Sequence, residues 1–174
     1  MELKQSYYNS EILEARIMER LKTCCFTGHR KLPQDKIEQI LIRLNQEVDN
    51  LISQGITDFI SGGALGFDQL AASLVVAKKE MGNNIRLIFA LPCKNQDMLW
   101  SAEQKRLYRG LLDEADEIIY VSEEYTNDCM KKRNYYMVDR SAHCICAQIY
   151  ETGGTAQTVR YTRGRTINVI NVAL

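Results

Sequence analysis

Histidine and closely spaced cysteine pairs are scarce in this 174-residue sequence. It contains two histidines, His29 and His143, and no CxxC pair. Because structural zinc sites draw their ligands from cysteine and histidine at short, regular spacings, we predict no metal site. The six cysteines lie in or beside apolar segments with no secretion signal before them, which favours free buried thiols over disulfides.

Long apolar runs are absent as well. No stretch approaches the roughly 20 apolar residues that a membrane-spanning helix requires. The first 22 residues carry acids where a signal peptide would have a basic head and an apolar centre. We therefore expect a cytoplasmic protein with no membrane partner. With 45% hydrophobic and 25% charged residues, the chain has the composition of one globular domain with a single core.

Two nucleotide-binding motifs are also missing. The sequence has no GxxxxGK followed by Ser or Thr, which disfavours a P-loop nucleotidase. A dinucleotide-binding Rossmann site would have GxGxxG after the first strand and an acid about 20 residues further on. Here the glycine spacing differs and no acid stands at that place. Hydride transfer is therefore a minor alternative, and we predict no cofactor.

The sequence has no net charge, because 22 Lys and Arg balance 22 Asp and Glu. The charge is uneven, however: residues 128–174 contain seven basic and three acidic residues, so this part is +4 and the remainder −4. A local basic surface fits an anionic small ligand or a nucleic acid, and an ordinary solvated helix face explains it equally well. Without net basic charge, nucleic acid is the less favoured partner.

Short β-prone segments alternate with longer segments of helical periodicity. The strands are predicted at residues 23–27, 57–61, 85–91, 117–122, 143–150 and 166–172. The helices are predicted at 35–54, 68–81, 99–114, 129–141 and 155–163, and a further amphipathic segment precedes the first strand. Such alternation predicts an α/β fold with a mainly parallel sheet of about six strands and helices on both faces.

Three strand-to-helix turns are chemically unusual. They are Thr27-Gly28-His29-Arg30, Gly62-Gly63-Ala64-Leu65-Gly66-Phe67-Asp68 and Thr152-Gly153-Gly154-Thr155. In a parallel sheet such turns emerge at one edge, outside which ligands bind. Glycine allows backbone N–H groups to approach an anion closely at a helix N-terminus. The turns therefore indicate an anion cradle, with a purely structural tight bend as the alternative.

Several side chains near these turns are candidates for ligand contacts. Asp68 either accepts hydrogen bonds from ligand hydroxyls or caps its own helix. Arg133 either reaches an anion as a bidentate donor or is an ordinary surface arginine. For His29 and Arg30 the alternative is capping or ordering of their own loop. Thr155 either contacts a phosphate or caps its own helix. The predicted ligand-binding residues are Gly28, His29, Arg30, Gly62, Gly63, Gly66, Asp68, Arg133, Gly153, Gly154 and Thr155.

Four segments together resemble the YpsA-like family of the SLOG superfamily, which also includes DprA and the Lonely-Guy phosphoribohydrolases. They are CCFTGHR, ISGGALGFDQLAA, CMKKRNYYMVDRSAH and GGTAQTVRYTRGRTINVINV, and the match runs from about residue 23 to 172. The resemblance implies a three-layer Rossmann-like domain at 23–174, preceded by a helical extension at 1–22. It also implies a nucleotide or nucleotide-derived ligand at the glycine-rich edge.

The resemblance does not supply a reaction. The Lonely-Guy enzymes carry a glutamate three residues after the threonine of their PGGxGTxxE motif, and the corresponding residue after Thr155 is Thr158. Cleavage of an N-glycosidic bond passes through an oxocarbenium-like state that a carboxylate stabilises. The acids that could substitute are Asp68, Glu103 and Glu151.

Three functions follow from these observations, in order of preference. The first is binding or sensing of a nucleotide-like ligand, to which a partner protein responds. The second is hydrolysis of such a ligand, with Asp68 or Glu103 as the acid or base. The third is DprA-like binding of single-stranded nucleic acid. Because related folds often pair subunits through helices, the amphipathic segment ILEARIMERL also allows a homodimer, with packing on its own domain as an equal alternative.

Overall fold

The computed structural model describes the backbone of residues 2–174 and the side chains of residues 11–174. This part of the chain contains six strands and six helices. The strands are β1 (Thr23–Gly28), β2 (Asp58–Ser61), β3 (Arg86–Leu91), β4 (Glu117–Tyr120), β5 (His143–Ala147) and β6 (Asn168–Asn171). The helices are α1 (Glu2–Leu21), α2 (Gln34–Ser53), α3 (Phe67–Glu80), α4 (Ala102–Asp113), α5 (Cys129–Asp139) and α6 (Gly153–Thr162). Every segment predicted as a strand or a helix contains one.

All six strands run parallel in one sheet, in the order β4-β3-β2-β1-β5-β6. The chain first adds strands on one side of β1 as far as β4, and then crosses to the other side for β5 and β6. The strand order therefore reverses beside β1, which is where open parallel sheets bind their ligands.

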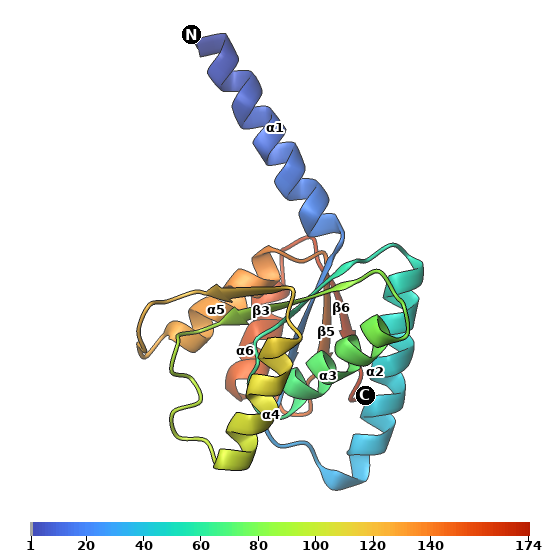
Figure 1. Ribbon diagram of the computed structural model, residues 1–174. Coiled ribbons are helices and arrows are strands. Elements are labelled where there is room, and N and C mark those ends of the chain that lie inside the picture. Colours follow the sequence, from blue (N-terminus) through green and yellow to red (C-terminus); the bar gives the residue numbers. More distant parts are fainter. Residues whose placement is uncertain (1) are drawn as a thin grey trace.

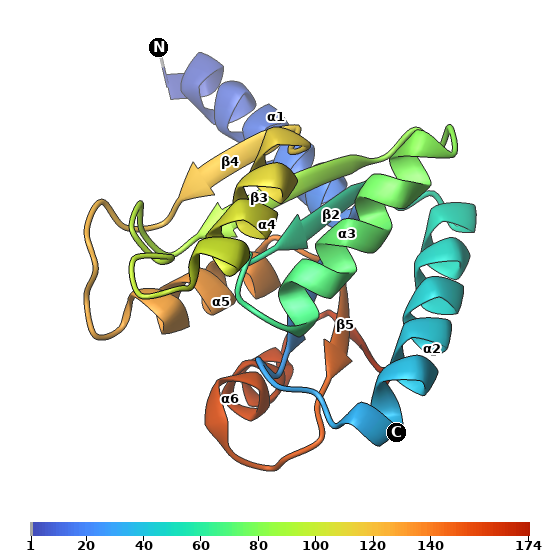
Figure 2. The ribbon, with the colours of Figure 1, turned by 60° about the horizontal axis from the view of Figure 1, so that its bottom comes forward.

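The sheet is covered on both faces (Figures 1 and 2). Helices α2, α3 and α4 pack on one face, and α5 and α6 pack on the other. Phe26, Phe59 and Phe89 are fully buried on the first face, whereas the alternate residues Cys25 and Ile60 are buried on the second. Successive side chains of a strand point to opposite faces, so strands covered on both sides are apolar throughout. The predicted three-layer Rossmann-like α/β fold is confirmed.

Strand β5 is three residues shorter than the sequence predicts. The N–H of Gln148 donates to the side chain of Asn171 at 3.1 Å. The N–H groups of Ile149 and Tyr150 both donate to His29 Nε2, at 3.1 and 3.3 Å. The prediction of a strand up to residue 150 is wrong at its end, because side chains rather than a neighbouring strand bind these backbone groups.

Two helix starts differ from the prediction by more than one residue. Helix α4 begins at Ala102 rather than at residue 99, because Ser101 and Gln104 form a capping box. Helix α6 begins two residues earlier than predicted, at Gly153, which has a φ of 88°. The second glycine pair is thus part of the helix itself.

Helix α1 (blue in Figure 1) extends away from the amino edge of the sheet and beyond both helical layers. It corresponds to the extension predicted at 1–22, of which residue 1 lies outside the described residues. Within residues 2–174, no helix is both long and apolar enough to cross a membrane. The described side chains include no group of three or more His, Cys, Asp or Glu that could hold a metal ion. All six cysteines are free and buried, as predicted.

Candidate functional site

The three unusual turns meet at the carboxyl edge of the sheet. They follow β2, β1 and β5, which are neighbouring strands, and a pocket of about 250 Å³ lies between them. Its lining residues are Thr27, Gly28, His29, Arg30, Ala64, Asp68, Met130, Arg133, Asn134, Gly154 and Thr155. Segments that are far apart in the sequence thus form one pocket where the strand order reverses.

The pocket brings together part of the predicted site. The predicted residues that line it are Gly28, His29, Arg30, Asp68, Arg133, Gly154 and Thr155. The predicted glycines Gly62, Gly63, Gly66 and Gly153 belong to the same turns but do not line it. Among the three candidate acids, Asp68 lines the pocket, while Glu103 and Glu151 are exposed and lie outside it.

Gly62 and Gly66 are required by packing. A Cβ atom on Gly62 would overlap the guanidinium of Arg133 and lie 2.7 Å from Asp68 Oδ2. Gly66 has a φ of 87°, and a Cβ there would lie 2.6 Å from the carbonyl oxygen of His29. The two glycines therefore let the turn after β2 approach Arg133 and the turn after β1. At Gly62 and Gly66 the space beside the backbone is filled by other parts of the protein, which agrees with a structural role of these two glycines in a tight bend.

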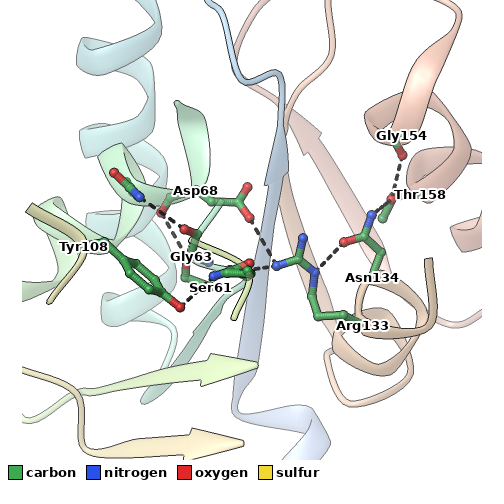
Figure 3. Close-up of polar contacts among 11 residues, drawn as sticks. Ser61, Gly63, Asp68, Tyr108, Arg133, Asn134, Gly154 and Thr158 are labelled. Carbon is green, nitrogen blue, oxygen red and sulfur yellow. Dashed lines mark hydrogen bonds and ion pairs between the residues drawn. The ribbon is translucent and has the colours of Figure 1, made fainter. Parts of the chain in front are cut away.

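Arg133 lies at the centre of the site (Figure 3). Its side chain projects from the first turns of α5 and the residue is 4% exposed. Nη1 donates to the carbonyl oxygen of Gly62 and lies 3.9 Å from Asp68 Oδ2. Nε donates to Asn134 Oδ1 at 2.7 Å. Among the described residues Nη2 has no hydrogen-bond partner, so this end of the guanidinium is available to a ligand in the pocket.

A chain of hydrogen bonds joins Arg133 to the start of α6. Asn134 Nδ2 donates to the hydroxyl of Thr158 at 2.9 Å. That hydroxyl donates to the carbonyl oxygen of Gly154 at 2.8 Å. Figure 3 shows these contacts, which link the first turn of α6 to Asn134 beside the guanidinium. Thr158, where the Lonely-Guy motif has its glutamate, has a structural role in this chain.

Asp68 lies in the first turn of α3 and is 5% exposed. Burial raises the pKa of Asp68 to about 6, although the positive charge of Arg133 opposes this rise. The carboxyl group therefore changes protonation near neutral pH. Inside the pocket it can accept a hydrogen bond as a carboxylate or donate one as an acid.

The N-terminus of α6 opens into the pocket. A Cβ on Gly153 or Gly154 would meet nothing within 4 Å, and the N-cap residue Thr152 makes no capping hydrogen bond. The first N–H groups of a helix have no partner inside it and form the positive end of its dipole. Because Gly154 and Thr155 line the pocket together with Arg30, the site combines helix donors with a cationic side chain.

Other supporting contacts come from residues that the sequence did not single out. Ser61 donates to the carbonyl oxygen of Asp68 at 2.9 Å and accepts from the N–H of Gly63 at 3.2 Å. Gln96 donates to the hydroxyl of Tyr108 at 2.7 Å. The position of Ser61, a polar residue at the end of an apolar strand, is a sequence signal that could have pointed to its contacts with Asp68 and Gly63. Nothing in the sequence places Gln96 beside Tyr108.

His29 connects the turn after β1 to the segment that leads into α6. Its Nε2 atom accepts hydrogen bonds from the N–H groups of Ile149 and Tyr150, and its ring lies 4.9 Å from that of Tyr150. An unprotonated Nε2 is required for these contacts. Burial lowers the pKa of His29, which favours this neutral form.

We expect His29→Leu to lower the free energy of unfolding at pH 7.5 by about 1–3 kcal/mol, the contribution of two lost hydrogen bonds. The folded-state pKa of His29 lies below its ordinary value of 6.5. Its contribution is therefore complete above that value and is lost as the pH falls through it. Urea unfolding at pH 7.5 and 5.5 should show a smaller loss of stability at low pH for His29→Leu than for the wild type. Equal losses in the two proteins would contradict this role.

Sequence comparisons place the chain in a family. Residues 24–165 match YpsA, described as the YspA SLOG family. The uncharacterized SPbeta prophage-derived protein YoqJ of Bacillus subtilis strain 168 is 35% identical over 140 residues, which cover 71% of this chain and 82% of YoqJ. A UPF0398 protein of Halalkalibacterium halodurans is 26% identical over 98 residues, covering 55% of this chain and 52% of that protein.

Solved structures of DNA processing protein A share the fold. The structure of the Helicobacter pylori protein, which concerns a single-stranded DNA binding mode, matches with a TM-score of 0.62 and 16% sequence identity. The matched region covers 89% of this chain and 66% of the Helicobacter pylori chain. The Streptococcus pneumoniae protein matches with a TM-score of 0.62 and 15% sequence identity, and the matched region covers 86% of this chain and 49% of the Streptococcus pneumoniae chain. The chain spans about half the length of this protein and of the UPF0398 relative. Because the family match extends from β1 to beyond α6, the chain belongs to the YpsA family of the SLOG superfamily.

Proposed function

We propose that the pocket at the carboxyl edge binds a nucleotide or a nucleotide-derived ligand. The observation that carries this proposal is the guanidinium of Arg133, which is buried and held by Gly62 and Asn134 but keeps Nη2 unpaired among the described residues. A guanidinium fixed in this way needs little further ordering when an anion binds. Such an arrangement is typical of phosphate recognition.

The pocket offers different groups to the parts of such a ligand. The N-terminus of α6 and Arg30 suit a phosphate, and the carboxyl group of Asp68 suits the hydroxyl groups of a sugar. The volume of about 250 Å³ is slightly below the range of about 300–1,000 Å³ that is typical of small-molecule sites. We therefore infer that the pocket holds the sugar and phosphate, while the base extends outside it. A partner protein would respond to the bound state.

This proposal agrees with the comparisons at a coarser level. The SLOG family and the DprA-like fold are consistent with a function related to nucleotides or nucleic acids. The zero net charge of the chain favours a small ligand over a nucleic acid, because nucleic-acid binding depends on many phosphate contacts.

Thermal-shift measurements with AMP, ADP-ribose and NAD test the proposal. A ligand at a hundred times its dissociation constant stabilises the folded state by about 2.7 kcal/mol. We expect Arg30→Ala to weaken binding of the active ligand by about tenfold or more, since a hydrogen bond to a charged group contributes about 1.5–3 kcal/mol. Arg30 is exposed, so the variant should keep its stability without ligand.

The control is Lys31→Ala, which removes a neighbouring exposed cation that does not line the pocket. It should bind as the wild type does. Equal weakening by both variants would indicate a general charge effect and contradict a specific site. Salt-sensitive binding of an oligonucleotide without stabilisation by any nucleotide would instead favour DprA-like binding of single strands.

A hydrolase acting on the same ligands is the second candidate function. The observation that favours it is the pKa of about 6 for Asp68 inside the pocket, because a carboxyl group that titrates near neutral pH suits general acid or base catalysis. Incubating a bound nucleotide and measuring released base or phosphate by chromatography tests this reaction. Product that disappears with Asp68→Asn supports the hydrolase, and an unchanged ligand supports binding alone.

A further inference from the structure

Helix α1 exposes most of its described side chains to solvent. Every residue from 11 to 19 is exposed. At its carboxyl end the helix is connected to the domain by two hydrogen bonds: Arg20 Nη2 donates to the carbonyl oxygen of Thr166 at 2.6 Å, and Thr23 donates to the carbonyl oxygen of Glu19 at 2.7 Å. The family match begins at residue 24, so α1 lies before the part of the chain that matches the family.

The exposed surface of α1 contains large apolar side chains. Leu13 is 60% exposed, Ile17 49% and Met18 55%, and Leu21 and Ile12 are exposed as well. Burying one such side chain contributes about 1.5–3 kcal/mol. A helix that projects from its own domain can obtain this stabilisation only from another surface.

A groove of about 490 Å³ lies beside the carboxyl half of α1, at the amino edge of the sheet. Its floor is apolar and consists of Ile60, Ile88 and Ile119 from three neighbouring strands. Ile17 of α1 forms part of its wall. The proposed ligand pocket lies at the opposite, carboxyl edge, so the groove is a separate surface.

The charged rim of the groove has unpaired cations. Arg86 pairs with Asp58 at 3.4 Å and with Glu117 at 3.0 Å, and Asp139 pairs with Arg165 at 3.1 Å. Within residues 11–174, no carboxylate lies within salt-bridge distance of three rim arginines: Arg16, Arg20 and Arg140. The groove thus combines an apolar floor with three arginines that lack a carboxylate partner, and with one acid, Glu19, that lacks a cationic partner within the same residues.

The free half of α1 has the complementary pattern. Leu13 lies between Glu11 and Glu14, and within residues 11–174 neither glutamate has a cationic partner. This segment precedes the half that borders the groove. It cannot bend back into the groove of its own chain, because it continues the same helix away from the sheet (Figure 1).

We propose that the groove is filled by α1 of a second copy of this chain. The two α1 helices lie antiparallel, and Leu13 of each enters the groove of the other. A twofold axis makes both contacts equivalent. Only the antiparallel direction brings the free half of one helix beside the groove-lining half of the other, with Glu11 and Glu14 near Arg16 and Arg20. The resulting homodimer leaves both ligand pockets open.

Light scattering after size-exclusion chromatography tests this interface on the full chain. We expect the wild type to have twice the monomer mass, and Leu13→Glu and Ile17→Glu to have the monomer mass. The control Leu107→Glu replaces an exposed apolar residue of α4 outside the groove and should remain dimeric. A monomeric wild type, dimeric Leu13→Glu and Ile17→Glu variants, or a monomeric control would each overturn the proposal.

Cross-linking tests the direction of the helices without relying on a disruptive variant. Because all six native cysteines are buried, an introduced exposed cysteine supplies the reactive thiol. Under mild oxidation with diamide, Leu13→Cys combined with Glu117→Cys at the groove rim should form a covalent dimer, whereas Leu13→Cys alone should not. Cross-linking of the single variant to itself would indicate parallel helices and overturn the proposal, as would the absence of a link in the double variant.

Discussion

Replacing Arg133 with methionine is expected to lower the free energy of unfolding at pH 7.5 by about 3 kcal/mol or more. The guanidinium is the cation nearest to Asp68, at 3.9 Å, and both side chains are buried. Methionine fills a similar space but leaves the carboxylate in a low-dielectric environment without its counter-charge. Urea unfolding followed by circular dichroism measures the change. Lys132→Met, on the exposed face of the same helix, should cost less than about 0.5 kcal/mol.

The pH dependence distinguishes this electrostatic effect from a loss of packing. The folded-state pKa of Asp68 is about 6, above its ordinary value of 3.8. The folded protein therefore takes up a proton more readily than the unfolded chain, and this group adds stability as the pH falls through that range. Arg133 lowers the pKa of Asp68, so in the Arg133→Met variant this pKa is higher still. As the pH falls, the variant therefore begins to gain stability at a higher pH than the wild type, and its total gain is larger. The difference between Arg133→Met and wild type should shrink from pH 8 to pH 5, and a constant difference would contradict the pairing.

The fold could be predicted from the sequence because its signals are local and repeated. The periodicity of Ile40, Leu44, Val48 and Leu51 predicts the buried side of α2, and these residues are indeed buried. Apolar runs such as residues 85–91 indicate strands covered on both faces, as β3 is. The ends of helices and strands were less predictable where a side chain distant in the sequence binds the backbone at that end. The end of β5 depends on His29 and Asn171, which no local pattern places there.

The candidate site was predictable at the level of turns rather than of individual residues. Parallel topology requires the turns after β1, β2 and β5 to share an edge, and the structure brings them into one pocket. A glycine, however, looks the same in a sequence whether it admits a ligand or a neighbouring side chain. Gly62 accommodates Arg133, whereas Gly154 faces open space. The contact of Thr158 with Asn134 joins two helices and has no sequence signal of its own.

Replacing Gly66 with alanine is expected to lower the free energy of unfolding by about 3 kcal/mol or more. Its backbone has a φ of 87° and a ψ of −125°, a conformation that costs an L-residue about 1–3 kcal/mol. In addition, the new Cβ would lie 2.6 Å from the carbonyl oxygen of His29. Because the obstacle is backbone, the turn after β1 must move, and overpacking of this kind costs about 1–3 kcal/mol.

Gly82→Ala is the matched control for this substitution. Gly82 has a similar φ of 92°, but a Cβ there would meet nothing within 4 Å. Its replacement should therefore cost only the backbone strain, about 1–2 kcal/mol. The difference between the two variants in urea unfolding measures the close approach of the turns after β1 and β2. If Gly66→Ala and Gly82→Ala are equally stable, that approach does not contribute, and the turn holding Asp68 beside Arg133 owes its position to other contacts.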